Sequence, residues 1–226
     1  VTKKRMPSGV DTSYKNTQFD LSNEGHNRMI MKAGFGQASS MIEGGEIEDP
    51  LNSVMREWGV NPNDYIGRGQ ETREVIQNAK RENGPERGYT HYKNLRNEQL
   101  TDAFHYTLFP NFAVSLWADG FHFLRAKPHP TDPEKCVFDN WWYASNPEHE
   151  TSPVRTTVGV SKRGELAEHE VFDLGKKSLG QTIDQDSAVF IFQQHGLRSR
   201  GFNRAYFAGQ EKRIRRFHEM IESYFE

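Results

Sequence analysis

Two aspartates, Asp184 and Asp186, stand at the start of an apolar segment near the end of the chain, residues 186–197 (DSAVFIFQQHGL). A carboxylate at the start of a helix can accept hydrogen bonds from free backbone N–H groups, so either residue could cap a helix. Alternatively, one aspartate turns inward and binds a metal. A carboxylate with two histidines leaves open positions for dioxygen on non-haem Fe(II). Spacing alone leaves both interpretations open.

The nine histidines offer no local metal motif, because no two are four residues apart and none joins a cysteine–histidine knuckle. His105 and His122 lie in predicted strands and could face one another across the sheet. A packed histidine is the more usual interpretation of each. The single cysteine, Cys136, excludes an internal disulfide and any cluster held by two cysteines of this chain. It fits a reducing cytoplasm, which is the expected location.

Other signatures of chemistry are absent from the sequence. There is no phosphate-binding loop, no dinucleotide fingerprint and no nucleophile elbow. With 29 basic and 31 acidic residues, the chain has no general attraction for nucleic acid or anionic lipid. The basic run at residues 212–216 (KRIRR) is interpreted as the solvated face of an amphipathic helix. No run of 18 apolar residues exists, so we expect neither a nucleic-acid nor a membrane partner.

The first half of the chain predicts short extended pieces and helices. Gly59 and Gly84 offer the ends of two of these helices. The second helix is mostly polar and is expected to be peripheral. The extended pieces are residues 17–21 and 27–32, and the helices are 50–58, 70–83 and 97–103.

From His105 onward, aromatic and β-branched runs alternate with turn residues, which predicts an antiparallel meander. The runs are residues 105–109, 112–117, 121–126 and 136–144. Two helices are expected to close the chain, at about 186–198 and 210–225. Strands followed by long helices indicate one α+β domain over residues 1–226, with the helices packed across one sheet.

Several stretches resemble the catalytic domain of the alpha (large) subunit of Rieske-type non-haem iron, ring-hydroxylating oxygenases. Their order and separations also match that family. The stretches are residues 19–29 (FDLSNEGHNRM), 105–111 (HYTLFPN), 119–143, Asp186, 194–197 (QHGL), Ser199 and Gly201. The resemblance implies a helix-grip (START/Bet v 1-like) fold, an antiparallel sheet wrapped on a long C-terminal helix.

The resemblance also implies a metal site. Asp186 matches the family's aspartate ligand of the mononuclear iron, although Ile191 replaces a position that is often polar or acidic. The family's two histidine ligands form a His-x4-His element before the segment that resembles residues 17–29. The chain opens with Val1 and does not include that element or a Rieske domain. We therefore expect an N-terminally truncated catalytic domain that is inactive when isolated.

By resemblance, the intact parent uses Fe(II) and dioxygen to hydroxylate or demethylate an aromatic or otherwise apolar substrate. Electrons would come from a Rieske [2Fe–2S] cluster supplied by a reductase or ferredoxin, and a homotrimer is possible. Sheet and helix are expected to face each other around a substrate pocket. Its expected walls are Phe104, Tyr106, Leu108, Phe112, Val114 and Phe190, for which ordinary core packing is the alternative.

A second hypothesis keeps the cavity and discards the metal. The chain would then be a helix-grip binding module for an apolar small molecule or lipid. It would bind its ligand without iron. An in-frame His-x4-His element upstream of Val1 separates the two hypotheses.

Overall fold

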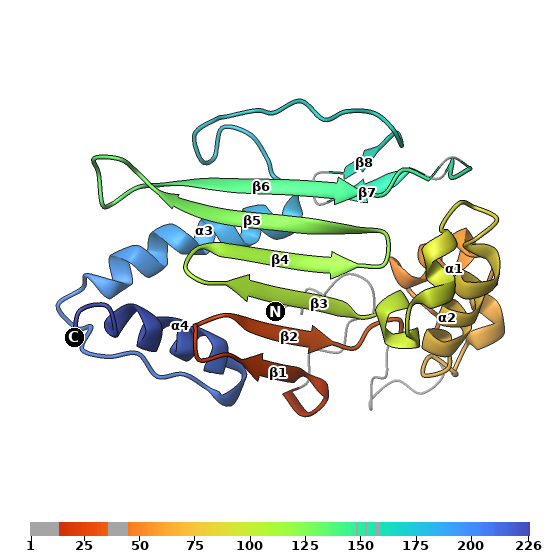
Figure 1. Ribbon diagram of the computed structural model, residues 1–226, viewed down its shortest axis with the longest axis horizontal. Coiled ribbons are helices and arrows are strands. Elements are labelled where there is room, and N and C mark those ends of the chain that lie inside the picture. Colours follow the sequence, from red (N-terminus) through yellow and green to blue (C-terminus); the bar gives the residue numbers. More distant parts are fainter. Residues whose placement is uncertain (1–13, 36–44, 148, 152, 157–158) are drawn as a thin grey trace. The chain divides into compact units, whose positions relative to one another are not determined.

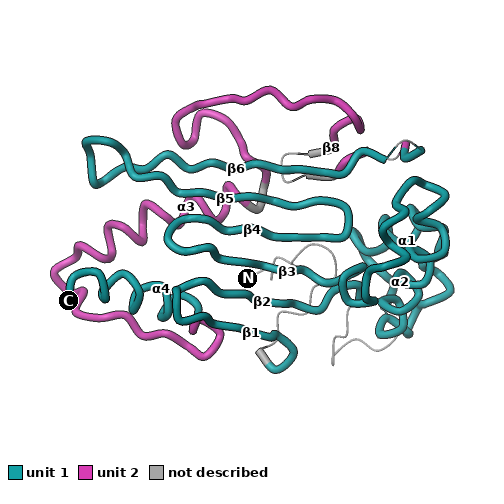
Figure 2. The backbone as a smooth tube through the Cα atoms, in the orientation of Figure 1, with its two compact units in different colours: residues 1–150, 213–226 teal, residues 151–212 magenta. Residues whose placement is uncertain are grey.

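The computed structural model describes residues 14–35, 45–147, 149–151, 153–156 and 159–226. The chain divides into two compact units. Unit 1 comprises residues 1–150 and 213–226, and unit 2 comprises residues 151–212 (Figure 2). Each unit is described separately below.

Unit 1 is built on a six-stranded antiparallel sheet in which the strands follow one another in chain order (Figure 1). The predicted meander is therefore confirmed. Two of its strands have the predicted bounds, and β3 begins two residues earlier than predicted. The strands are β1 (Gln18–Leu21), β2 (Asn27–Met31), β3 (Ala103–Leu108), β4 (Phe112–Trp117), β5 (Gly120–Pro128) and β6 (Cys136–Ala144).

Between β2 and β3 the chain leaves the sheet and forms a layer of short helices. The prediction of a helix over residues 97–103 is wrong at its end, because Ala103 already pairs with Met31 of β2 as the first residue of β3. The helices are α1 (Leu51–Glu57), η3 (Pro62–Tyr65), α2 (Thr72–Asn83), η4 (Thr90–Asn94) and η5 (Asn97–Leu100), and η2 (Tyr14–Asn16) precedes β1.

The polar composition of α2 predicted a peripheral helix, and this prediction is wrong. Ile76 and Ala79 are three residues apart and therefore lie on the same face, where both are buried. They join two apolar clusters that form the most buried part of unit 1. One contains Trp58, Ala79, Tyr89, Tyr92 and Leu100, and the other contains Ile47, Leu51, Met55 and Ile76.

An ion pair between Arg73 and Asp102 fixes this helical layer to the sheet. The Asp102 side chain is 3% exposed and accepts hydrogen bonds from both terminal nitrogens of Arg73. It also accepts the backbone N–H of Ala33 at 3.1 Å, and Arg73 donates to the carbonyl of Ala33 at 2.8 Å. Since Ala33 follows β2, Asp102 precedes β3 and Arg73 belongs to α2, the pair joins three segments.

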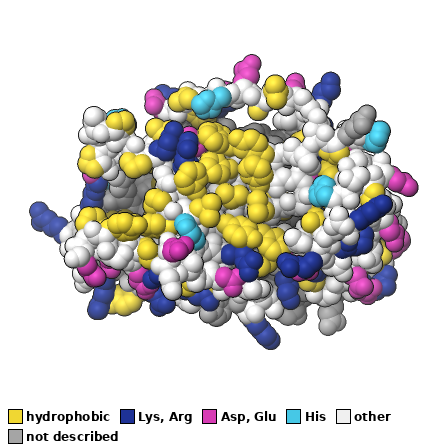
Figure 3. All heavy atoms as spheres, in the orientation of Figure 1, with side chains coloured by type: hydrophobic (Ala, Val, Ile, Leu, Met, Phe, Trp, Pro, Cys, Tyr) yellow, Lys and Arg dark blue, Asp and Glu magenta, His cyan; other side chains and the backbone are white. Residues whose placement is uncertain are grey.

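The two faces of the sheet carry different chemistry, because successive strand residues point to opposite sides. One face, named here the aromatic face, is rich in large apolar side chains. Figure 3 looks onto this face and shows hydrophobic side chains gathered over the strands. The aromatic face comprises Phe104, Tyr106 and Leu108 of β3, Phe112, Val114 and Leu116 of β4, Phe121, Phe123 and Arg125 of β5, and Asp139, Trp141 and Tyr143 of β6.

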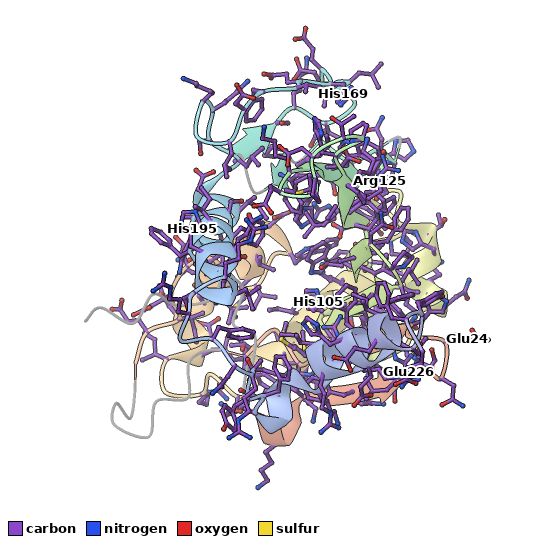
Figure 4. All side chains as sticks on the ribbon, turned by 90° about the vertical axis from the view of Figure 1, so that its left-hand side faces the viewer. Glu24, His105, Arg125, His169, His195 and Glu226 are labelled. Atoms are coloured by element: carbon purple, nitrogen blue, oxygen red, sulfur yellow. The ribbon has the colours of Figure 1, made fainter. Side chains whose placement is uncertain are left out.

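The opposite side, named here the histidine face, holds His105 and His122. In Figure 4, His105 and Arg125 point to opposite sides of the sheet. The histidine face comprises Asn27 and Met29 of β2, His105 and Thr107 of β3, Ala113, Ser115 and Trp117 of β4, His122 and Leu124 of β5, and Asn140 and Trp142 of β6.

The C-terminal helix α4 (Lys212–Glu222) packs against unit 1 at the ends of the strands. Its Phe217 ring lies 5.7 Å from the ring of Phe109, between centroids, and Tyr224 beyond the helix stacks on the same ring at 6.0 Å. The predicted solvated face at residues 212–216 is only partly correct. Arg215 is exposed, whereas Arg213 and Arg216 are half-buried and hydrogen-bonded to unit 1. An α+β fold with an antiparallel sheet and a C-terminal helix is thus confirmed.

Unit 2 contains a small hairpin and a long helix. The hairpin pairs β7 (Val154–Thr156) with β8 (Gly159–Ser161), and the helix α3 runs over Gln181–Leu197, followed by η6 (Gly209–Glu211). The helix α3 begins five residues before the predicted start at Asp186. None of the helices in the described part of the chain is both long and apolar enough to cross a membrane.

The buried pair should contribute far more to stability than a surface pair. We expect Asp102→Asn to lower the free energy of unfolding by about 3–5 kcal/mol, because it leaves the guanidinium of Arg73 without its counter-charge. Asp20→Asn is the matched control, since it breaks the Arg28–Asp20 pair, whose side chains are 37% and 48% exposed. That loss should not exceed about 1 kcal/mol. Urea unfolding of both variants measures the difference, and equal losses would contradict the anchoring role of Asp102.

Candidate functional site

A row of side chains crosses the histidine face from β2 to β6. Cross-strand pairing places His105 opposite Ser115, Ser115 opposite His122, and His122 opposite Trp142. Directly paired residues on one face are close enough for their side chains to interact. Met29 extends the row at the β2 end, where it pairs with His105.

Both histidines are held by neutral partners. His105 Nδ1 and the hydroxyl of Ser115 are 2.5 Å apart, and His122 Nε2 lies 2.5 Å from the side-chain oxygen of Asn140. The His122 ring also lies 5.0 Å from the ring of Trp142, between centroids. Each histidine therefore has one ring nitrogen fixed and the other without a hydrogen bond to the described residues. That second nitrogen still has the capacity for a hydrogen bond.

Burial keeps both histidines neutral. Loss of hydration, together with the nearby Arg213 and His122, lowers the pKa of His105 to about 4. Burial also lowers the pKa of His122, while the hydrogen bond to Asn140 opposes that change. At neutral pH the two rings are therefore uncharged hydrogen-bonding groups. Beside the indole of Trp142, they form a surface that suits an apolar ring with a few polar substituents.

Arg213 brings a positive charge to the same face. Its Nε donates a hydrogen bond to the side-chain oxygen of Asn27, and its Nη2 donates to the hydroxyl of Thr107 at 2.7 Å. Asn27 and Thr107 are directly paired across β2 and β3, in the row next to His105. Burial lowers the pKa of the guanidinium. An arginine nevertheless keeps its positive charge in proteins.

The six predicted pocket residues belong to two different units. The structure places five of them on the aromatic face, opposite the two histidines: Phe104, Tyr106, Leu108, Phe112 and Val114. Phe190 belongs to α3 in unit 2, where its side chain is 50% exposed. The six pocket walls therefore stay a prediction. The two faces of the sheet are alternative locations for the substrate pocket.

Of the two aspartates, Asp184 has a structural task. Its carboxylate accepts the backbone N–H of Leu179 at 2.7 Å and the hydroxyl of Ser178, and these bonds lower its pKa. Asp184 therefore fastens the segment before α3, although the residue at the N-cap itself is Gly180. Asp186 lies on α3 and is exposed. Within the described ranges, no three histidine, cysteine, aspartate or glutamate side chains come together as a metal site.

Iron would therefore need ligands beyond those that the described residues assemble around Asp186. A Rieske cluster requires two cysteines and two histidines, and this chain has one cysteine, the exposed Cys136. The residues present thus do not fit that cluster. Neither group can be built from the side chains described above.

The fold and this face define the class of protein: an α+β domain whose antiparallel sheet carries a C-terminal helix. The model of one protein family, the ring hydroxylating alpha subunit (catalytic domain), matches residues 39–226. Because the match covers most of the chain, the chain belongs to this family. No significant match was found among curated proteins or among solved structures.

The sequence analysis missed Ser115 and Asn140 of the histidine face, and it missed Arg213 of α4. The strand parity that separates His105 from Phe104 was available in the sequence, since neighbouring strand residues point to opposite sides. Reading β3 to β5 by parity would have grouped His105 with Thr107 and His122 with Leu124. Arg213 gave no such signal, because its partners lie more than 100 residues away in the chain.

The neutral state of His105 predicts a pH dependence of stability. Its pKa is about 4 in the folded chain against an ordinary value of 6.5, so the unfolded chain binds the proton more readily. The stability contributed by the neutral ring is complete above pH 6.5 and is lost as the pH falls to 4, up to about 3 kcal/mol. His105→Gln should flatten this loss, as measured by urea unfolding between pH 4 and 7.5. The exposed His195→Gln should not, and equal slopes for both variants would refute the assignment.

Proposed function

We propose that this chain is the substrate-holding part of a ring-hydroxylating oxygenase, which uses mononuclear Fe(II) and dioxygen to hydroxylate or demethylate an aromatic or apolar substrate. The family membership supports the oxygenase class. The histidine face supports the substrate class, because it combines neutral hydrogen-bonding groups with indole and aliphatic surface. This combination is the single observation on which the proposal rests.

In this proposal the histidine face binds and orients the substrate ring. Trp142 and Leu124 offer apolar surface, and the free ring nitrogens of His105 and His122 can bond a polar substituent. Since Ser115 and Asn140 fix the other nitrogens, each imidazole plane is held before a ligand arrives. Such preorganisation reduces the entropy lost on binding.

We further propose that Asp186 supplies the carboxylate ligand of the iron, with two histidines from a His-x4-His element outside the described residues. When bound, Fe(II) would supply the activation of dioxygen. Electrons would come from a Rieske [2Fe–2S] domain and its reductase or ferredoxin, and a homotrimer would bring such domains together. The isolated chain would then be inactive. A metal-free module that binds an apolar small molecule or lipid would use the same histidine face without iron.

Two neighbouring residues of β4 test which face holds the ring. Ala113 lies on the histidine face between Thr107 and Leu124, whereas Val114 lies on the aromatic face between Tyr106 and Phe123. We expect Ala113→Phe to weaken binding of naphthalene at least tenfold, because the new ring fills the site. Val114→Phe should change it less than twofold. Isothermal titration calorimetry measures both, and the reverse pattern would favour the predicted walls around Phe104 and Tyr106.

The iron assignment is tested on the full open reading frame that encodes this chain. We expect the DNA upstream of the Val1 codon to encode a His-x4-His element. We also expect Asp186→Asn to reduce bound iron at least tenfold, measured by metal analysis after anaerobic loading. Asp184→Asn is the control, because Asp184 is engaged with Ser178 and Leu179. Unchanged iron content in the Asp186 variant would overturn the assignment, and a start codon without the histidines would favour the metal-free module.

A further inference from the structure

Arg213 is a half-buried cation that meets no carboxylate among the described residues. Its two hydrogen bonds go to neutral oxygens, those of Asn27 and Thr107. No acidic side chain contributes to its pKa, which burial alone lowers. A guanidinium that loses water without gaining a counter-charge is unfavourable, so this arrangement calls for an explanation.

The other half-buried arginines of unit 1 are better satisfied. Four of them pair with a carboxylate of another segment: Arg28 with Asp20 at 2.5 Å, Arg73 with Asp102, Arg87 with Glu150 at 2.6 Å, and Arg125 with Asp139 at 2.6 Å. Arg81 bonds three backbone carbonyls and the side-chain oxygen of Asn97. Arg216 bonds two carbonyls and Glu219. Arg213 differs from all of these because it has two acceptors, neither of them charged.

The guanidinium of Arg213 also has donors to spare. Nη1 makes no hydrogen bond to the described residues, and Nη2 uses one N–H for Thr107. Adjacent N–H groups on the two terminal nitrogens form a fork that matches the two oxygens of a carboxylate. Nε is already engaged with Asn27, which fixes the plane of the group.

Beside this charge lies the surface already proposed for the ring. Thr107, which bonds the guanidinium, pairs with Ala113, and Ala113 pairs with Leu124. The apolar side chains of Ala113 and Leu124 therefore continue the row across β4 and β5. Neighbouring strands are about 5 Å apart, so a ring attached to a carboxylate at Arg213 would reach these residues directly. His105, two residues before Thr107, adds a neutral ring nitrogen at the side.

We propose that Arg213 binds the carboxylate of an aromatic acid whose ring lies on the histidine face. This inference rests on the proposed function, because it takes the same face as the substrate site. It narrows the substrate from an aromatic compound in general to one that carries a carboxylate. The acid would supply the counter-charge that the described residues do not give to Arg213.

Binding of benzoate and of its neutral analogue benzamide to the full chain tests the inference. Isothermal titration calorimetry should show benzoate binding at least tenfold more tightly than benzamide. A hydrogen bond to a charged group is stronger than a neutral one, and the difference corresponds to about a tenfold ratio of dissociation constants. Arg213→Gln should remove this preference. Arg213→Lys should keep part of it, because the charge stays and the fork is lost.

Arg216→Gln is the matched control. It removes another arginine of α4, whose guanidinium donates hydrogen bonds to the backbone carbonyls of Ser22 and Asn23. It should leave the ratio of the two affinities unchanged. If circular dichroism shows that Arg213→Gln does not fold, the inference is tested by the benzoate-to-benzamide affinity ratios of the wild-type chain and of Arg213→Lys.

Failure of this inference can be told apart from failure of the proposed function. If naphthalene binds and Ala113→Phe weakens that binding at least tenfold, but benzoate is not preferred over benzamide, the aromatic-acid inference is overturned and the proposed substrate face stands. An equal loss of preference in the Arg213 and Arg216 variants would also overturn it. Absence of binding by naphthalene, benzoate and benzamide alike would overturn both.

Discussion

The buried pair of Arg73 and Asp102 is the contact on which unit 1 depends. The strands β2 and β3 are neighbours in the sheet, yet the whole helical layer lies between them in the chain. Bringing the two ends of this long segment together costs conformational entropy, and contacts between those ends help to offset that cost. Asp102 makes those contacts from the return point, since it binds both Arg73 of α2 and the backbone of Ala33 where the excursion begins. The apolar clusters around Trp58 and Met55 then consolidate the helices themselves.

Once β2 and β3 are joined, the pleat of the sheet separates two kinds of surface. The aromatic face gathers ring contacts, such as Phe121 with Tyr143 at 4.6 Å and Phe123 with Trp141 at 5.3 Å, between centroids. The histidine face mixes aliphatic, indole and neutral polar groups. A one-residue change of register in β3 would exchange the two sets of side chains. The position of Ala103 opposite Met31, next to the buried Asp102, therefore determines which side chains lie on each face of the sheet.

The strands of the meander could be predicted because their signals are local. Pro110, Asp119-Gly120 and Pro128 end apolar runs within a few residues, and β4 and β6 have the predicted bounds. The helix α2 was misjudged because its buried face is narrow, and average polarity hides a narrow face.

The candidate site was predicted in part. The histidines and the family could be recognised from local stretches, as could the position of Asp186, whose metal-binding role stays a prediction. The tie from Arg213 to Asn27 and Thr107 could not be predicted, because it joins segments that are far apart in the chain and no periodic pattern connects them. Partners of that kind follow from the fold as a whole.

Gly25 links the first hairpin of the chain to its last helix. It lies in the turn between β1 and β2 with φ of +82°, and a Cβ there would stand 2.8 Å from Met220 and 3.0 Å from Phe109. A larger residue would strain the turn and push α4 away from it. Because α4 carries Arg213, such a displacement would withdraw the positive charge from the histidine face. The electrostatic character of that face is thus set partly by a glycine on an outer turn of the sheet, where the close packing leaves no room for even one methyl group.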